Sequence, residues 1–252
     1  ARITQFPRTS LGTVTLEEYA RSHGHQVPIK RFGASAWSLE TDDADSLMAK
    51  IRAAGVPLKD FIGSAPLYGI KTGFNDAFLI DTATKERLVR DDPNCANILK
   101  PYLRGQDIKR WKSEWAGLWM ILLKSSENHA WTWQNAGENA ESVFAQTYPS
   151  IYTYMKGYET QLRKRQDQGR YWWELRSCAY YDSFEPSKIL YQVIQFHSAY
   201  SLDVEKRFIN DKGFMLSSSD LWLLSVLNTP LMWWFGWRHL SHMKDEALNP
   251  AG

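Results

Sequence analysis

Apolar side chains recur at steps of three and four along much of this chain, which is the spacing of one face of an α-helix. Residues 44–51 follow this spacing, and Asp42 or Asp43 can cap the helix that they predict. Residues 149–162 follow it too and predict one longer helix, because Pro149 is placed at its first turn. Shorter helices are expected at residues 16–21, 82–89 and 139–146, and a helix pair is expected at residues 217–235.

Short apolar runs of a different kind predict strands at residues 77–80, 118–123 and 189–194. A hairpin is expected over residues 208–216, since a polar turn that ends in Gly213 separates its two apolar arms. Helices and strands are thus mixed along the chain without regular alternation. This order predicts an α+β fold with mixed short sheets, packed helices and a C-terminal helix pair.

Composition sets the outer bounds on domains and location. With 252 residues and 44% hydrophobic content, the chain can bury a sizeable core. Residues 1–60 have weaker periodicity and are expected to form an N-terminal helical connector, while residues 61–252 form the main domain. Cys95 and Cys178 are too few and too far apart for a disulfide framework, which indicates a reducing compartment, with the cytoplasm as the expected location. The apolar window at residues 221–240 is interrupted by polar side chains, so no membrane span is expected.

A polar loop and a basic segment carry the strongest local signal. In the loop, residues 68–75, glycines on both sides of Lys71 and Thr72 permit close approach of the backbone to a ligand, and Asn75 follows. Residues 100–112 then hold basic side chains against a single acid, Asp107; the basic residues are Lys100, Arg104, Lys109, Arg110 and Lys112. Tyr102 and Trp111 lie among them, and this mixture suits a polyanion with stackable bases. The net charge of +2 is too mild to indicate such a ligand alone, so local clustering matters more.

Further cations lie in the middle of the chain. Arg163 begins a run of three positive residues at the end of a predicted helix, where they either complement the helix dipole or contact phosphate. Arg170 and Arg176 lie on either side of Trp172 and Trp173. Adjacent residues of a strand point to opposite faces, so at least one of these tryptophans is expected in the core.

Three segments together resemble the target-recognition region of adenine-N6 DNA methyltransferases. They are YGIKTGFNDAFLID with ILKPYLRGQDIKRW (residues 68–111), GRYWWELRSCAYYDSFEPSKILY (residues 169–191) and LSVLNTPLMWWF (residues 224–235). The resemblance is to the TaqI-like specificity domain, which also occurs in type IIG restriction-modification enzymes, and it extends from about Phe61 to Phe235. It assigns residues 61–252 to such a domain.

The resemblance implies a division of labour between this domain and a catalytic one. Duplex DNA is the expected partner, read in its major groove while a methyltransferase domain of the same polypeptide modifies a flipped adenine. The Asn-Pro-Pro-Tyr-like motif of that family and its glycine-rich motif for S-adenosylmethionine do not occur in this sequence. No cofactor is therefore expected in this chain, and S-adenosylmethionine is expected in the catalytic domain of the parent protein. The parent is expected to be a site-specific adenine methyltransferase that can also carry endonuclease activity, and the chain alone is expected to be inactive.

Catalytic motifs and two other ligand classes also bear on the function. No nucleotide cradle, nucleophile elbow or zinc-protease helix motif occurs, and the pairs His23 with His25 and His239 with His242 lack a third ligand nearby, so no metal site is predicted. An RNA-binding module explains the basic and aromatic residues, and a carbohydrate-binding module explains the twelve tryptophans but not the basic segment. The candidate DNA-binding residues are Lys71, Thr72, Asn75, Lys100, Arg104, Lys109, Arg110, Arg163, Arg170, Trp172 and Arg176. For the loop residues, the alternative is a tight turn whose side chains satisfy local backbone groups.

Overall fold

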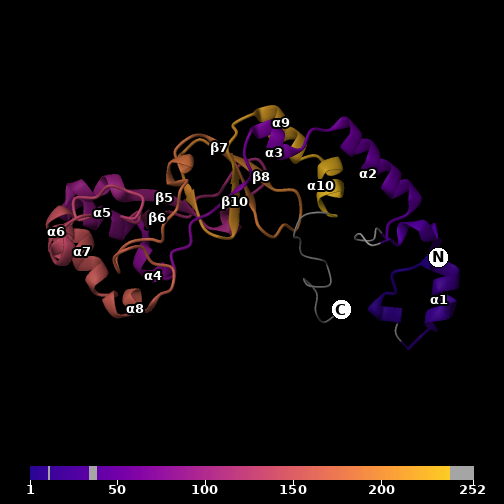
Figure 1. The fold of residues 1–252 in the computed structure, drawn as a ribbon, viewed down its shortest axis with the longest axis horizontal. Helices are drawn as coiled ribbons and strands as arrows, with labels where there is room; N and C mark the ends of the chain where they lie inside the picture. Colours follow the sequence, from indigo (N-terminus) through magenta and orange to yellow (C-terminus); the bar gives the residue numbers. More distant parts are fainter. Residues whose placement is uncertain (11, 34–38, 239–252) are drawn as a thin grey trace. The chain divides into compact units, whose positions relative to one another are not determined.

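The computed structural model describes residues 1–10, 12–33 and 39–238 (Figure 1). Contacts divide the chain into two compact units, the first being Ala1–Phe61 and the second beginning at Ile62. The division lies next to the boundary expected at residue 60. His239 and His242 lie outside the described residues. None of the helices in the described part of the chain is long and apolar enough to cross a membrane.

The first unit is small and mostly helical. Thr15 begins α1 through a capping box with Glu18, and Thr41, rather than Asp42 or Asp43, caps α2 by accepting a hydrogen bond from the backbone of Ala44. Acids fill the first turn of α2, where they complement the helix dipole. The elements are β1 (Arg2–Ile3), η1 (Arg8–Ser10), α1 (Leu16–His23), β2 (His25–Gln26), η2 (Ile29–Arg31), α2 (Asp42–Ala54) and α3 (Leu58–Ile62), which ends just past the division.

The second unit contains two four-stranded sheets, with strand orders β3-β10-β7-β8 and β4-β6-β5-β9. Their strand pairs are antiparallel, apart from the parallel pair of β5 with β9. The predicted α+β class is therefore confirmed. The strands are β3 (Leu67–Tyr68), β4 (Leu79–Asp81), β5 (Leu99–Leu103), β6 (Leu118–Ile121), β7 (Lys188–Gln192), β8 (Tyr200–Asp203), β9 (Phe208–Ile209) and β10 (Gly213–Leu216).

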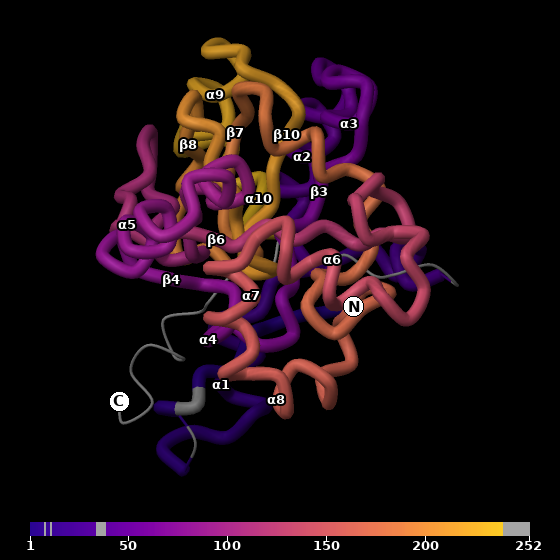
Figure 2. Tube along the Cα trace, turned by 90° about the vertical axis from the view of Figure 1, so that its left-hand side faces the viewer, coloured from indigo at the N-terminus to yellow at the C-terminus, as the bar shows by residue number. Residues whose placement is uncertain are grey.

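Helices cover the two sheets at different places. α5 packs on β4 and β6, α7 packs on α5 and α6, and α9 packs on β8. The helices are α4 (Asn75–Phe78), α5 (Thr82–Asp91), η3 (Pro93–Ile98), η4 (Gly105–Asp107), η5 (Gly137–Asn139), α6 (Ala140–Thr147), α7 (Pro149–Lys156), α8 (Glu159–Lys164), η6 (Tyr181–Phe184), α9 (Leu221–Leu227) and α10 (Pro230–Gly236). In the view turned by 90°, Figure 2 shows α9 and β8 of the second unit at the top and α8 at the bottom. The helix pair expected near the C-terminus is present as α9 and α10.

One hydrophobic core joins both sheets of the second unit. It runs from Ile70 to Met215 in the sequence and includes buried side chains of β5, β6, β9 and β10. Aromatic rings form a connected cluster within it: Phe144 stacks on Trp173 at 5.0 Å between ring centroids, and Trp133 meets Phe144 edge to face at 5.1 Å. Several of the tryptophans that mark the composition therefore stabilise this core.

Some expected elements differ from those observed. Residues 77–80 were expected as a strand, but the chain is helical over Asn75–Phe78 and extended only over Leu79–Asp81, because a four-residue apolar run has no period that separates the two states. The long helix at residues 149–162 is broken at Gly157 into α7 and α8. The expected hairpin is a turn between two sheets, since β9 pairs with β5 whereas β10 pairs with β3 and β7. Trp172 and Trp173 lie in a turn, not a strand, and both are buried.

Candidate nucleic-acid interface

The polar loop at residues 69–75 is attached to the turn between β9 and β10. The backbone N–H of Gly69 donates to the carbonyl of Gly213 at 3.0 Å, and that of Ile70 donates to the carbonyl of Ile209 at 2.7 Å. A Cβ atom at position 69 would overlap the carbonyl oxygen of Asn210, so the close approach requires glycine there. The loop is therefore held against a turn that lies far from it in the sequence.

The basic segment reaches the same turn from another direction. The backbone N–H of Asn210 donates to the carbonyl of Leu103 at 3.2 Å. A Cβ atom at Gly105 would lie 2.8 Å from the carbonyl oxygen of Lys212, which is closer than side chains tolerate. The loop, the basic segment and the turn thus meet at one place.

A hollow of about 250 Å³ opens where these three segments meet. Asn75 and Arg104, both predicted from the sequence, contribute to its lining. Gln106, Asn210 and Lys212 contribute as well and were not predicted, although Asn210 and Lys212 lie in the polar turn that the sequence marked. The remaining lining residues are Leu79, Tyr102 and Gly105. The surface therefore combines amide groups with two cationic side chains.

Asp107 fixes the orientation of Arg104. The buried carboxylate accepts two hydrogen bonds from the guanidinium, at 3.0 and 2.8 Å, and a third from the backbone N–H of Arg104 at 2.8 Å. This contact raises the pKa of Arg104 above its already high value, so the side chain stays charged. These two parallel hydrogen bonds use one edge of the planar guanidinium and leave its other N–H donors oriented for a ligand.

The basic segment continues into a short loop, residues 108–113, which we call the basic loop. Ile108 and Ser113 form an antiparallel bridge at its base, where the backbone N–H of Glu114 also donates to the carbonyl of Asp107 at 2.8 Å. Lys109, Arg110, Trp111 and Lys112 are all exposed between these fixed ends. Tyr102, which the sequence placed beside Trp111 as a stacking candidate, is buried instead.

The polar side chains of the loop at residues 69–75 are partly engaged within the protein. Lys71 forms an ion pair with Asp167 at 2.8 Å, and its hydrogen bond lowers the pKa of that carboxyl. Thr72 is only 3% exposed, and its hydroxyl donates to the Oδ1 atom of Asn75 at 2.6 Å. Thr72 therefore orients Asn75 and does not itself reach the surface, whereas Asn75 and half of Lys71 are exposed.

Three other predicted cations are bound to neighbouring groups and lie outside the hollow lining. Lys100 pairs with Glu185 at 3.0 Å, and Arg176 pairs with Asp167 at 3.3 Å. Arg170 donates to the backbone carbonyl of Gln134 at 3.2 Å. Arg170 and Arg176 are nevertheless exposed and keep donors that face solvent.

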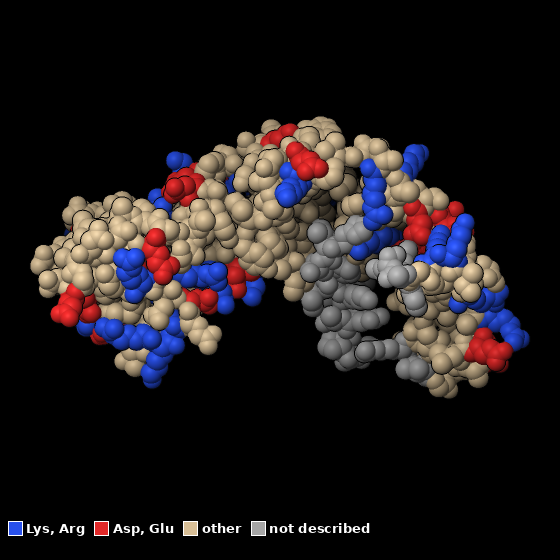
Figure 3. All heavy atoms as spheres, viewed as in Figure 1, with Lys and Arg blue, Asp and Glu red and all other residues tan. Residues whose placement is uncertain are grey.

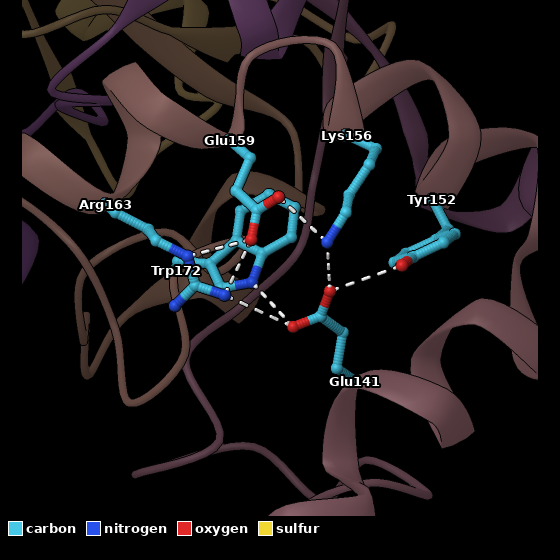
Figure 4. Close-up of polar contacts among 6 residues, drawn as sticks. All are labelled: Glu141, Tyr152, Lys156, Glu159, Arg163 and Trp172. Carbon is cyan, nitrogen blue, oxygen red and sulfur yellow. Dashed lines mark hydrogen bonds and ion pairs between the residues drawn. The ribbon is translucent and has the colours of Figure 1, made fainter.

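Arg163 and Trp172 belong to a polar network around Glu141 (Figure 4). The carboxylate of Glu141 accepts hydrogen bonds from Lys156 at 2.6 Å, from the Trp172 indole at 3.2 Å and from Arg163 at 3.3 Å. Burial acts to raise the pKa of Glu141, but the hydrogen bonds from Lys156 and Trp172 outweigh it and leave this pKa lowered. Trp172 is 4% exposed, so it presents no face for stacking.

Arg163 and Lys164 lie in the last turn of α8. Figure 3 shows Lys and Arg side chains gathered at this end of the second unit, with acidic side chains beside them. Arg163 also pairs with Glu159 at 2.7 Å within its own helix. Acids therefore pair with Arg163 at this end, whereas at the basic loop no acid forms an ion pair with Lys109 or Lys112 among the described residues.

Arg165, the third cation of the run at residues 163–165, has a structural place that the sequence did not reveal. Its guanidinium is buried and donates to the backbone carbonyls of Thr72 at 2.7 Å, of Trp172 at 3.0 Å and of Glu174. Burial lowers its pKa to about 10, which still leaves the group charged at neutral pH. Arg165 thereby connects the loop at residues 69–75 to the aromatic core.

Comparisons with known proteins give a weak structural likeness. No family model matches the sequence, and no curated protein matches it. The solved structure of the Type IIL restriction-modification enzyme MmeI in complex with DNA is similar to part of the chain, with 11% sequence identity and a TM-score of 0.39. The match covers 67% of this chain and 21% of that chain. A likeness this weak carries no argument about function, which has to rest on the residues themselves.

Proposed function

We propose that the second unit is a DNA target-recognition domain of a site-specific adenine-N6 methyltransferase. The observation that carries this proposal is the meeting of the loop at residues 69–75, the basic segment and the turn at residues 209–213 around one polar hollow. The basic loop follows directly in the chain and adds unpaired cations. The resemblance of the same segments to TaqI-like specificity domains supports the assignment.

The residues of this surface suit the two tasks of a DNA reader. Lys109 and Lys112 can neutralise phosphates and supply affinity that does not depend on sequence. Asn75, Gln106 and Asn210 carry amides, and an amide can make paired hydrogen bonds with adenine. Arg104, oriented by Asp107, is the side chain best suited to guanine.

The methylation chemistry is proposed to lie in another domain of the same polypeptide, which would be a type IIG restriction-modification enzyme. That domain would bind S-adenosylmethionine and hold the flipped adenine. The present chain would contact the flanking duplex and choose the sequence. Calorimetry of the full chain with S-adenosylmethionine is expected to show no binding.

Fluorescence anisotropy with labelled duplex DNA, single-stranded RNA and a glycan tests the proposal. The full chain is expected to prefer duplex DNA, and the logarithm of its affinity should fall linearly with the logarithm of salt concentration. Lys109→Ala and Lys112→Ala should each reduce this slope by about one unit. Arg90→Ala removes an exposed cation of α5 and should leave the slope unchanged. Preference for RNA or glycan, or an unchanged slope in both lysine variants, would overturn the proposal.

A further inference from the structure

Trp111 has a backbone conformation that a bulky residue rarely adopts. Its φ angle is 76°, in the left-handed region that favours glycine, and its side chain is 47% exposed. The indole is only partly buried, and its side chain forms no hydrogen bond with the described part of the chain, so no such side-chain contact accounts for the conformation. Backbone outliers of this kind cluster at ligand contacts, where neighbouring structure maintains them.

The surrounding structure holds Trp111 in place from several sides. Its backbone N–H donates to the carbonyl of Tyr200 at 2.8 Å, and it forms a parallel bridge with Ser201. The preceding residue, Arg110, donates to the backbone carbonyl of Asn228 at 2.7 Å. Asn228 is itself buried and bonds both backbone groups of Tyr200. The indole is therefore presented to solvent by a fixed backbone, which reduces the ordering cost of binding.

Several cations lie on the same loop as the indole. The Arg110 guanidinium lies 5.2 Å from the centre of its ring, and Lys109 and Lys112, within two residues of Trp111, are exposed. A protein partner would favour an apolar surrounding for a projecting tryptophan, since charged residues are depleted from the centre of such interfaces. A π surface among cations instead fits a ligand that offers a flat base between phosphates.

We propose that Trp111 stacks on a DNA base that has left the helical stack, or fills the gap that such a base leaves. The inference rests on the proposed DNA-binding function and deepens it. Paired bases expose only their edges in the grooves, so a tryptophan can reach a base face only where the stack is opened. The cations of the basic loop would hold the phosphates on either side while the indole occupies the opening.

The test compares two labelled duplexes of the same sequence, one fully paired and one with a single abasic position. For the full chain, binding is expected to be tighter to the abasic duplex. Trp111→Ala should reduce this preference about tenfold, equivalent to about 1.4 kcal/mol, and Trp111→Phe should restore part of it. Trp111→Gly, which accepts the same backbone angle, should lose the preference as Trp111→Ala does and guards against a folding defect.

Trp115→Ala is the matched control. Trp115 is 37% exposed and lies close in the sequence, but its indole donates to the carbonyl of Leu118 at 2.9 Å and its ring packs on Trp119. This variant should keep the preference for the abasic duplex. If the full chain binds DNA and both Trp111→Ala and Trp111→Gly keep its preference, the stacking role is wrong and the indole belongs to a protein contact. If the full chain binds neither duplex, both the stacking role and the proposed DNA-binding function are wrong.

Discussion

At the scale of single residues, the backbone of Trp111 shows a conflict between local preference and long-range contacts. The left-handed conformation costs a residue with a Cβ atom about 1–2 kcal/mol relative to its preferred states. The hydrogen bond to Tyr200 and the anchoring of Arg110 on Asn228 offset this cost in the fold. A residue better suited to the angle would relieve this cost, so the tryptophan lowers the stability of the fold at this position.

Replacement of Trp111 by glycine and by alanine measures that cost. Glycine accepts the observed φ of 76°, whereas alanine does not. The free energy of unfolding of Trp111→Gly is expected to exceed that of Trp111→Ala by about 1 kcal/mol, since the relief of strain outweighs the added freedom of the unfolded chain. Urea denaturation of the full chain supplies both values. An alanine variant at least as stable as the glycine variant would show that the backbone is not strained at this position.

The sequence predicts the chemical character of a site residue better than the exposure of its side chain to solvent. Lys109 and Arg110 were expected at the surface and lie there, because charged side chains rarely find enough partners to be buried. Thr72 and Trp172, by contrast, are buried, and groups distant in the sequence bond to them: Arg165 donates to the Thr72 carbonyl, and Glu141 accepts from the Trp172 indole. No local pattern reveals such partners. Whether the exposed residues contact DNA stays a prediction.

At the scale of elements, the attachment of the loop at residues 69–75 depends on a missing side chain. Gly69 lies so close to Asn210 that an added Cβ atom would overlap a backbone oxygen, which cannot move without displacing the turn. Gly69→Ala is therefore expected to lower the free energy of unfolding by about 2–3 kcal/mol and to weaken DNA binding. Gly157→Ala is the control, because its Cβ would meet Tyr154 at an ordinary 3.4 Å. Equal stability of the two variants in thermal unfolding would contradict the close approach.

The Glu141 network gives stability that depends on pH. Because its folded pKa is lowered, the contribution of Glu141 is fully present above the unfolded value of about 4.3 and is lost as pH falls through the folded pKa. Glu141→Gln is expected to cost about 1 kcal/mol at neutral pH, and the difference from the unmodified chain should shrink below about pH 4. Urea denaturation of both proteins, from neutral pH to below about pH 4, measures this difference in the free energy of unfolding. Glu138→Gln, at an exposed position nearby, should show no such pH-dependent difference.

Elements with strong local signals were predicted correctly, and those that depend on pairing were not. The helices at residues 16–21, 82–89 and 139–146 match α1, α5 and α6 within a few residues, because caps and periodicity act locally. The segment at residues 208–216 was expected to pair with itself, yet its two halves enter different sheets. The sequence therefore marked each of the three segments that form the hollow, but not that they meet there.

At the scale of the whole molecule, hydrophobic burial is divided unequally between the two units. Among the described residues of the first unit, the buried hydrophobic side chains are those of Val27 and Met48. The continuous core from Ile70 to Met215 lies entirely within the second unit. The second unit therefore contains both the apolar burial needed for independent folding and the whole candidate interface.

Separate expression of the two units tests this division. A fragment of residues 62–252 is expected to unfold in one cooperative transition and to bind duplex DNA within about threefold of the affinity of the full chain, a difference of about 0.7 kcal/mol. A fragment of residues 1–61 is expected to lack cooperative unfolding, since its few buried apolar groups cannot offset the entropy of the chain. Calorimetry and anisotropy on both fragments measure these outcomes. A large loss of affinity in a folded 62–252 fragment would instead place DNA contacts in the first unit, where Lys30, Lys50 and Arg52 would be the cations to replace next.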